Sequence, residues 1–215
     1  SVSIGALERF VGDWALANSL TREEEIVENN LSVAIIGSGP AGIACAASMR
    51  RMGYIVDVYE ALHEFGGVLK YGIPDFRLPK HIVDEEIDNA KRLGVVFHKN
   101  VIVGKSITID QLMNEYNYKS IFIGSGAGLP KSLGIPGENL TGIYYANEFL
   151  TRVNLMKANR FPDAPTPVRI GQNVAVVGGG NVAMDAARTA KRLGAKNVFI
   201  LYRRDMEALP ARLEE

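Results

Sequence analysis

Gly37, Gly39 and Gly42 have the spacing G-x-G-x-x-G and directly follow the apolar run 33–36. Each position has a mechanical reason. Gly37 lets the chain turn sharply off a strand, Gly39 lets the backbone approach a pyrophosphate, and Gly42 lets the next helix pack close to the strand. That helix directs its free N–H groups and its positive dipole end at the diphosphate. The stretch 31–42 therefore predicts a dinucleotide site, although one such motif alone is weak evidence.

A second copy of this motif strengthens the prediction. Gly178, Gly180 and Ala183 have the spacing G-x-G-x-x-A, again after an apolar run, 173–177. We expect a helix from there to about residue 193 and a strand over 198–202. The strand–glycine loop–helix–strand order of a dinucleotide-binding unit thus occurs twice.

The residues after the second strand of each copy differ. Glu60 lies about 20 residues past the first glycines, where a carboxylate holds ribose hydroxyls and repels a 2′-phosphate. We therefore expect FAD or NAD at the first site, not NADP. Arg203 and Arg204 occupy the corresponding place in the second copy. Guanidinium groups suit bidentate phosphate contacts, so the second site predicts NADP.

The expected fold class is α/β, with two Rossmann-like, three-layer ββα domains of the FAD/NAD(P)-binding type, the second incomplete. The chain ends one strand after the second motif, and we expect it to be a piece of a longer protein. The predicted divisions are a helical segment over 1–30, a first domain over 31–160, a proline-rich linker over 161–172 and a second domain over 173–215.

Other elements follow from hydrophobic periodicity and turn residues. Within 1–30, Thr21 and Glu24 form a possible capping box for a second helix, and the apolar face of this segment should dock on the body or on a partner. The remaining expected elements are helices over 80–93, 108–116 and 143–157, short strands over 95–97 and 101–103, and a buried strand over 120–124.

The stretch 61–80 is irregular but unusually apolar, with the paired glycines Gly66 and Gly67. An apolar loop of this kind can form a wall of a buried ligand site. It can equally cover the edge of the sheet, and the stretch alone favours neither.

Bulk properties exclude several classes of protein. Lys and Arg together equal Asp and Glu at 24 each, which argues against nucleic-acid binding as the main function. No apolar run has the length that a bilayer requires, and we expect a cytoplasmic protein with no membrane contact. A single cysteine, Cys45, excludes an internal disulfide and a multi-cysteine metal site, and we assign no metal ligand.

No side chain has a pattern that indicates acid, base or nucleophilic catalysis, and we assign no catalytic residue. The three histidines, at 63, 81 and 98, are interpreted as surface residues, and Cys45 as a buried thiol. Asp185 and Glu207 receive no role.

Three stretches resemble the glutamate synthase small-subunit family: EALHEFGGVLKYGIPDFRLPK (60–80), FIGSGAGLPKSLGIPGENLTGIYYANEFL (122–150) and VVGGGNVAMDAARTAKRLGA with LYRRDMEALPA (176–211). That group includes the NADPH-binding flavin subunits of ferredoxin:NADP transhydrogenases and sulfide dehydrogenases, and adrenodoxin reductase is a more distant relative. The resemblance covers nearly the whole chain, including LERFVGDWA near its start.

The resemblance implies FAD in the first domain and NADPH in the second. The implied contacts to the FAD pyrophosphate and ribose are Gly37, Ser38, Gly39, Pro40, Ala41, Glu60 and Ala61. Gly66, Gly67, Leu69, Gly72 and Ile73 would line the flavin, Val101 the adenine and Gly126 the middle of the cofactor. Gly178, Gly180, Asn181 and Val182 would hold the NADPH pyrophosphate, with Arg203 and Arg204 on its 2′-phosphate.

The resemblance further implies an oxidoreductase that accepts hydride from NADPH onto FAD. Electrons would pass to a glutamate synthase large subunit or a ferredoxin-type protein, through iron–sulfur clusters on segments or partners outside this chain. We expect little activity from the 215 residues alone. The alternatives are a subunit of a ferredoxin:NADP transhydrogenase or sulfide dehydrogenase, and a nucleotide-binding scaffold without catalytic activity.

Overall fold

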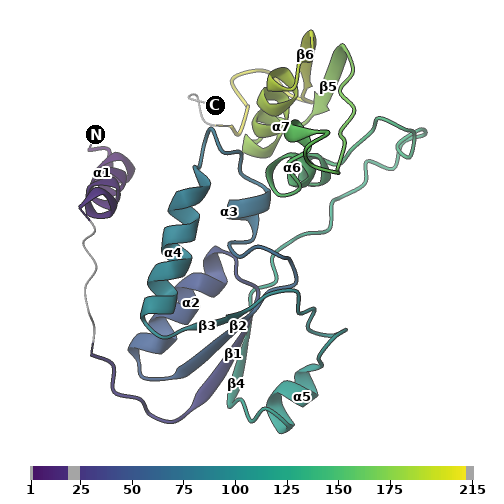
Figure 1. The fold of residues 1–215 in the computed structure, drawn as a ribbon. Helices are drawn as coiled ribbons and strands as arrows, with labels where there is room; N and C mark the ends of the chain where they lie inside the picture. Colours follow the sequence, from purple (N-terminus) through teal and green to yellow (C-terminus); the bar gives the residue numbers. More distant parts are fainter. Residues whose placement is uncertain (1, 19–24, 212–215) are drawn as a thin grey trace.

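The computed structural model describes residues 2–18 and 25–211. Its strands form two parallel sheets, one of four strands in the order β3-β2-β1-β4 and one of two strands, β5-β6. Figure 1 shows the larger sheet with its helices as one unit and the smaller sheet with α6 and α7 as a second. The α/β class and the repeated parallel arrangement confirm the predicted fold class.

Strand β1 (Ser32–Ile36) is central in the larger sheet and pairs in parallel with β2 (Ile55–Tyr59) and β4 (Ser120–Ile123). Strand β3 (Val96–His98) pairs with β2 at the outer edge. All carboxyl ends therefore lie along one edge of the sheet, where ligands bind in open α/β folds.

Helices cover both faces of this sheet. On one face, α2 (Pro40–Arg51) packs on β1, β2 and β4, and α4 (Lys80–Arg92) packs beside α2. The core there consists of Val33, Ile35, Ala46, Val56, Val58, Ala90 and Val95. The opposite face carries a second core, to which the short helix α5 (Ile109–Asn114) contributes Leu112. The result is a three-layer unit whose rigid sheet positions the loops at its carboxyl edge.

Three expectations for this unit differ from the structure. Residues 101–103 form an isolated bridge between Val103 and Ile107 rather than a strand, because the chain turns at Gly104. The expected irregular stretch 61–80 contains one helical turn, α3 (Val68–Tyr71), which starts after Gly67. The expected buried strand β4 leaves Phe122 and Ile123 exposed, because it is an edge strand of the sheet.

The second unit is smaller. Strand β5 (Asn173–Val177) pairs in register with β6 (Asn197–Leu201), and α7 (Asn181–Arg192) connects them. Helix α6 (Ala146–Asn154) packs on α7 through Phe149, Leu150, Ala186 and Ala190. The proposed division at residues 160 and 173 stays a prediction, and by its packing α6 lies with the second unit. A 3₁₀ turn, η1 (Ala158–Arg160), follows α6.

The N-terminal helix α1 (Ile4–Ala17) confirms helical structure at the start of the chain. None of its residues is buried, and its apolar side chains, Ile4, Leu7, Phe10, Val11 and Trp14, are exposed. The expected capping box at Thr21 and Glu24 lies outside the described residues. Residues 25–30, expected to be helical, are not, because Asn30 takes a left-handed conformation and the Asn29 side chain accepts from the backbone N–H of Leu31.

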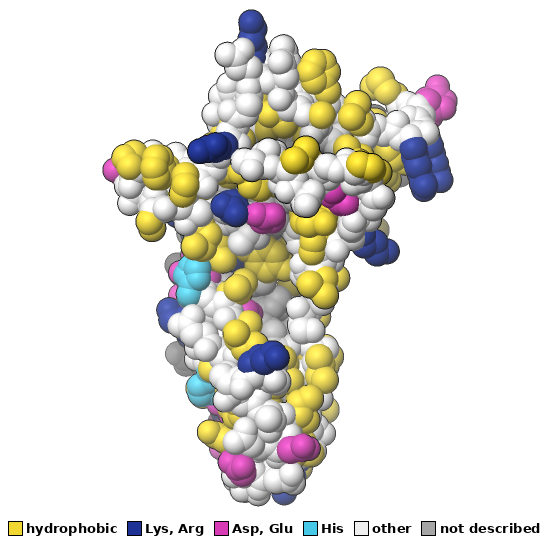
Figure 2. Space-filling view, turned by 90° about the vertical axis from the view of Figure 1, so that its right-hand side faces the viewer, with side chains coloured by type: hydrophobic (Ala, Val, Ile, Leu, Met, Phe, Trp, Pro, Cys, Tyr) yellow, Lys and Arg dark blue, Asp and Glu magenta, His cyan; other side chains and the backbone are white. Residues whose placement is uncertain are grey.

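Within residues 2–18 and 25–211, no helix is both long enough and apolar enough to cross a membrane. Hydrophobic side chains nevertheless show on the surface of both units (Figure 2). On β6, for example, Phe199 and Leu201 are both exposed.

Candidate functional site

The first glycine loop is built by contacts that leave no room for a side chain. A Cβ at Gly42 would lie 1.9 Å from the carbonyl oxygen of Gly37. Gly37 has a φ of +98°, and a Cβ there would lie 2.4 Å from the carbonyl oxygen of Gly124. The loop is thus held between the start of α2 and the chain that leaves β4. The spacing of the glycines indicates Gly37 and Gly42, whereas only the fold shows Gly124 as their neighbour.

Gly39 differs from these two glycines because its surroundings are open. It is the N-cap of α2 with φ −71° and ψ −178°, and a Cβ there would meet no atom within 4 Å. Gly180, the N-cap of α7, has a similar backbone with φ −92° and ψ 175°, and its Cβ position is equally open. In each unit, open space therefore lies directly before a helix N-terminus, where a diphosphate fits.

Glu60 lies at the end of β2 and is turned toward the first glycine loop. Its carboxylate accepts hydrogen bonds from the backbone N–H of Ser38 at 2.9 Å and from the Ser38 hydroxyl. Its other oxygen accepts from the N–H of Leu62 at 2.9 Å. A carboxylate offers about four acceptor positions, so one remains for a further donor such as a ribose hydroxyl. Glu60 is only 6% exposed, and this same geometry makes it a brace of the loop.

Ser38 joins this loop to the apolar segment 66–73. It is fully buried, and its hydroxyl and carbonyl oxygens both accept from the N–H of Gly66, each at 3.1 Å. A Cβ at Gly67 would lie 2.8 Å from the Cα of Gly39, so the segment lies directly against the glycine loop. Of the two hypotheses for stretch 61–80, this position favours the wall of a ligand site. Through these hydrogen bonds, the buried Ser38 connects the glycine loop to the segment 66–73.

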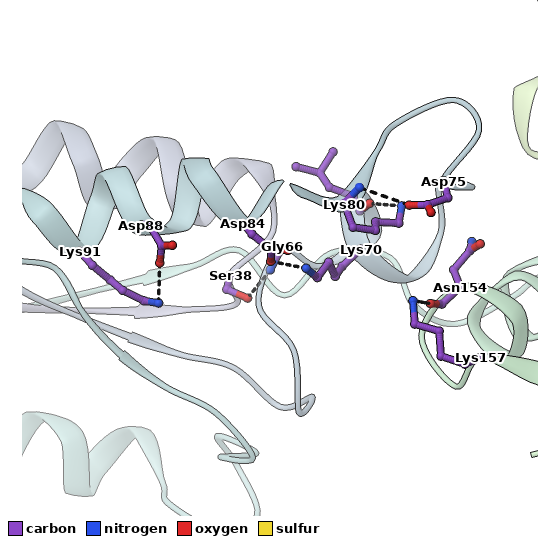
Figure 3. Close-up of polar contacts among 11 residues, drawn as sticks. Ser38, Gly66, Lys70, Asp75, Lys80, Asp84, Asp88, Lys91, Asn154 and Lys157 are labelled. Atoms are coloured by element: carbon purple, nitrogen blue, oxygen red, sulfur yellow. Dashed lines mark hydrogen bonds and ion pairs between the residues drawn. The ribbon is translucent and has the colours of Figure 1, made fainter. Parts of the chain in front are cut away.

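Two side chains that the sequence did not indicate, Lys80 and Asn154 (both labelled in Figure 3), contact the segment from its other side. The Lys80 ammonium donates to the carbonyl oxygen of Leu69 at 2.9 Å and to that of Ile73. The Asn154 amide donates to the carbonyl oxygens of Tyr71 and Gly72, each at 3.1 Å. Burial lowers the pKa of Lys80 to about 8. These capping contacts have no sequence signal, because no local pattern marks a lysine that bonds carbonyls 7 and 11 positions earlier or an asparagine that bonds carbonyls more than 80 positions earlier.

The second glycine loop packs against the chain that follows β6, where a Cβ at Gly179 would lie 2.7 Å from both Tyr202 and Leu209. Gly178 has a φ of +140°, and its N–H donates to the carbonyl oxygen of Leu201 at 2.9 Å. Asn181 is half-buried and Val182 is 55% exposed at the start of α7. Arg203 and Arg204 follow β6 after Tyr202, and both are exposed at the carboxyl end of that strand.

The predicted site residues thus fall into three groups. Around the carboxyl ends of β1 and β2 lie Gly37, Ser38, Gly39, Pro40, Ala41, Glu60, Ala61, Gly66, Gly67 and Val101. Leu69, Gly72 and Ile73 lie on α3 and the turn after it. Gly178, Gly180, Asn181, Val182, Arg203 and Arg204 lie together on the second unit. Gly126 stands apart, exposed on the chain after β4 with no atom within 4 Å of its Cβ position.

The histidines and Cys45, to which the sequence assigned no catalytic role, have no catalytic arrangement in the structure either. His63 and His81 are exposed, but His98 lies in β3, half-buried, where it stacks on Tyr59 and approaches Asp57 at 2.6 Å. Cys45, expected to be buried, is only half-buried, and this burial raises the pKa of its thiol, which argues against a reactive thiolate. Among the described residues, no group of three or more His, Cys, Asp or Glu side chains could hold a metal ion.

Asp185 is buried in α7 at 2% exposure and forms an ion pair with Arg77 of the first unit, at 3.3 Å. Phe76, the neighbour of Arg77, lies under two guanidinium groups of α7, those of Arg188 and Arg192. Asp185 therefore ties the two units together. Glu207 is exposed, and no contact assigns it a role.

Curated relatives match the chain over its full length. The putative oxidoreductase AegA of Escherichia coli is 38% identical over 100% of this chain and 33% of its own length. The glutamate synthase [NADPH] small chain of Escherichia coli is 35% identical over 100% of this chain and 46% of its own length. The β subunit of the NADP(+)-dependent formate dehydrogenase of Moorella thermoacetica is 41% identical over 96% of this chain and 28% of its own length. These matches confirm the predicted resemblance, and the chain spans between 28% and 46% of the length of these relatives.

Solved structures give the same picture for the fold. FprA from Mycobacterium tuberculosis in complex with NADPH has a TM-score of 0.67 and 27% identity, and it matches 84% of this chain and 45% of that one. Thioredoxin reductase from Lactococcus lactis has a TM-score of 0.58 and 25% identity, and it matches 86% of this chain and 59% of that one. A family model described as pyridine nucleotide-disulphide oxidoreductase matches residues 31–214. The chain belongs to the pyridine nucleotide-disulphide oxidoreductase family.

Proposed function

We propose that this chain forms the FAD- and NADPH-binding part of a flavoprotein oxidoreductase. The observation that carries the proposal is that the two glycine loops have neighbouring residues of opposite charge. Glu60 lies beside the first loop, and Arg203 and Arg204 follow the strand beside the second. A carboxylate favours a ribose with free hydroxyls, whereas guanidinium groups favour a 2′-phosphate.

The residues around both loops fit these cofactors. The open Cβ positions at Gly39 and Gly180 leave space for a pyrophosphate at the N-termini of α2 and α7. The remaining acceptor position of Glu60 suits a ribose hydroxyl, and the segment 66–73 supplies an apolar wall next to that loop. When bound, FAD supplies a ring that accepts hydride from NADPH.

The protein itself binds, orients and excludes water in this proposal. Its two glycine loops hold the charged ends of the cofactors, and segment 66–73 covers the first site. No acid or base is required for hydride transfer, which agrees with the structural roles of His98 and Asp185. Disulfide exchange within the chain is not part of the proposal, because Cys45 is its only cysteine.

We further propose that electrons leave toward a partner subunit or a further segment. The support comes from relatives named as subunits, such as the glutamate synthase small chain and the β subunit of an NADPH-Fe(3+) oxidoreductase of Geobacter sulfurreducens. The chain spans only part of these relatives. We therefore propose only the class of its final electron acceptor, which is an iron–sulfur or ferredoxin-type carrier.

The test uses the purified full-length protein. Release of FAD on denaturation and reduction of an artificial dye that depends on NADPH are the expected results. A protein that contains no flavin after expression in a flavin-rich host would contradict the proposal. A protein that binds nucleotide but reduces no dye would instead support a nucleotide-binding scaffold.

A further inference from the structure

The N–H groups of segment 69–73 donate to backbone carbonyls at positions 66–68, and its Lys70 side chain pairs with Asp84 of α4. Two side chains from outside the segment donate to its carbonyl oxygens. The side chain of Lys80, at the start of α4, donates to the carbonyl oxygens of Leu69 and Ile73. The side chain of Asn154, the last residue of α6, donates to the carbonyl oxygens of Tyr71 and Gly72. Four of the five carbonyl oxygens of residues 69–73 are thereby satisfied by two side chains from outside the segment. A four-residue helix cannot satisfy these groups alone, since its last carbonyls have no partner within the helix.

We propose that Lys80 and Asn154 are positioning residues that fix segment 69–73 against the first glycine loop, and that Asn154 ties this segment to the NADPH-binding unit. The inference rests on the proposed function, in which that segment faces the flavin. Three residues before the segment, the N–H of Gly66 donates two hydrogen bonds to Ser38 and so fixes the chain that leads into it. The segment is therefore held at both ends and in the middle.

The connection to the second unit runs through α6. Asn154 is 8% exposed, and the same helix packs Phe149 and Leu150 on α7. A second connection between the units lies four residues after this segment, where Arg77 pairs with Asp185 of α7. A cavity of about 210 Å³ lies where these contacts meet, and both Lys80 and Asn154 line it. A shift of α7, which carries the second glycine loop, is thus passed to segment 69–73 by direct contacts.

The charge around Lys80 fits a structural amine rather than a surface one. Its amine is half-buried, and burial is the main cause of its lowered pKa of about 8. Asp75 opposes this effect and raises the pKa, and the backbone N–H of Lys80 donates to the same carboxylate at 3.2 Å. The charged groups that also act on the Lys80 amine are Lys157, Lys70 and Asp185.

The experiment uses the full-length protein loaded with FAD. Asn154→Asp keeps the size of the side chain but turns an acceptor oxygen toward two carbonyl oxygens. Lys80→Met keeps the length and removes the donor, and Lys80→Arg restores a donor. Lys91→Met is the matched control, since Lys91 lies on the exposed face of the same helix, paired with Asp88 (Figure 3). The readouts are the flavin absorption spectrum, the rate of FAD reduction at saturating NADPH, the Kd for NADPH and the Tm.

We expect Asn154→Asp and Lys80→Met to slow FAD reduction roughly 10- to 100-fold, because a small misplacement of a reacting group has effects of this size. The flavin spectrum should shift, the Kd for NADPH should stay unchanged, and Lys80→Arg should recover most of the rate. Should Lys80→Met fail to fold, Asn154→Asp decides by the same readouts.

Variants that lose only Tm, with the spectrum and reduction rate of the wild type, would overturn this inference alone. A wild-type protein that NADPH does not reduce would overturn the proposed function, and this inference with it. The two failures are therefore distinguishable in one experiment.

Discussion

The same substitution at two glycines of one motif should change different properties, stability at Gly42 and FAD affinity at Gly39. In Gly42→Ala, the new methyl group would lie 1.9 Å from the carbonyl oxygen of Gly37, and Gly37 is itself held against Gly124. Such overpacking costs about 3 kcal/mol. For a chain of this size, that corresponds to a drop in Tm of roughly 6–12 °C. The helix α2 would have to move away from β1, and the loop with it.

Gly39→Ala should leave the fold nearly unchanged. Its Cβ position is open, and its φ of −71° is one that alanine adopts readily. The free energy of unfolding of the FAD-free protein should change by less than about 1 kcal/mol. The new methyl group would instead occupy the space proposed for the pyrophosphate, so FAD affinity should fall at least tenfold, about 1.4 kcal/mol.

The assay compares thermal melts of the FAD-free proteins with FAD titrations followed by flavin fluorescence. Gly42→Ala should lose stability, whereas Gly39→Ala should lose only affinity. If Gly39→Ala melts as low as Gly42→Ala, or binds FAD as tightly as the wild type, the assignment of this loop to the pyrophosphate is wrong.

Three further predictions concern the second unit and its junction with the first. Arg203→Ala combined with Arg204→Ala should weaken NADPH binding roughly 10- to 100-fold and leave NADH binding unchanged, because charge-assisted hydrogen bonds to a phosphate are lost; unchanged discrimination in a titration would remove both arginines from that role. Arg77→Ala should lower the free energy of unfolding by about 3 kcal/mol, because the buried Asp185 carboxylate loses its guanidinium partner. Adding Asp185→Asn should restore part of that loss in denaturant melts, and a strictly additive double variant would refute the pairing. The pKa of Lys80 is lowered to about 8 from 10.5, so between these pH values the unfolded chain binds more protons than the folded one. The stability of the wild type relative to Lys80→Met should therefore rise as pH increases through that window, and a flat or falling difference would contradict the burial of this amine.

The parts of the site that the sequence predicts are those set by local geometry. A turn off a strand, a close helix–strand approach and an open N-cap each need glycine at a fixed spacing, so Gly37, Gly39 and Gly42 identify themselves. The same holds for the chain after β2 and β6, because the carboxyl ends of parallel strands meet at one edge. The positions of Glu60 and of the arginine pair beside the glycine loops could therefore be predicted from the sequence.

The parts that the sequence did not predict depend on contacts that only the folded chain brings together. Asn154 reaches the carbonyls of residues more than 80 positions earlier in the chain, and no local pattern marks an asparagine at the end of a helix for that role. Lys80 likewise reads as an ordinary first-turn lysine until α3 is placed beside it. The exposure of β4 was missed for a related reason, since strand order decides which apolar strand lies at an edge.

The most direct test of the central claim is an anaerobic titration of the FAD-loaded full-length protein with NADPH, and in parallel with NADH. The account predicts that one equivalent of NADPH removes the visible absorption of the oxidised flavin, and that NADH does so only at much higher concentration. Flavin that stays oxidised in excess NADPH would contradict the account, and equal reduction by NADH would contradict the assignment of the second glycine loop to NADPH.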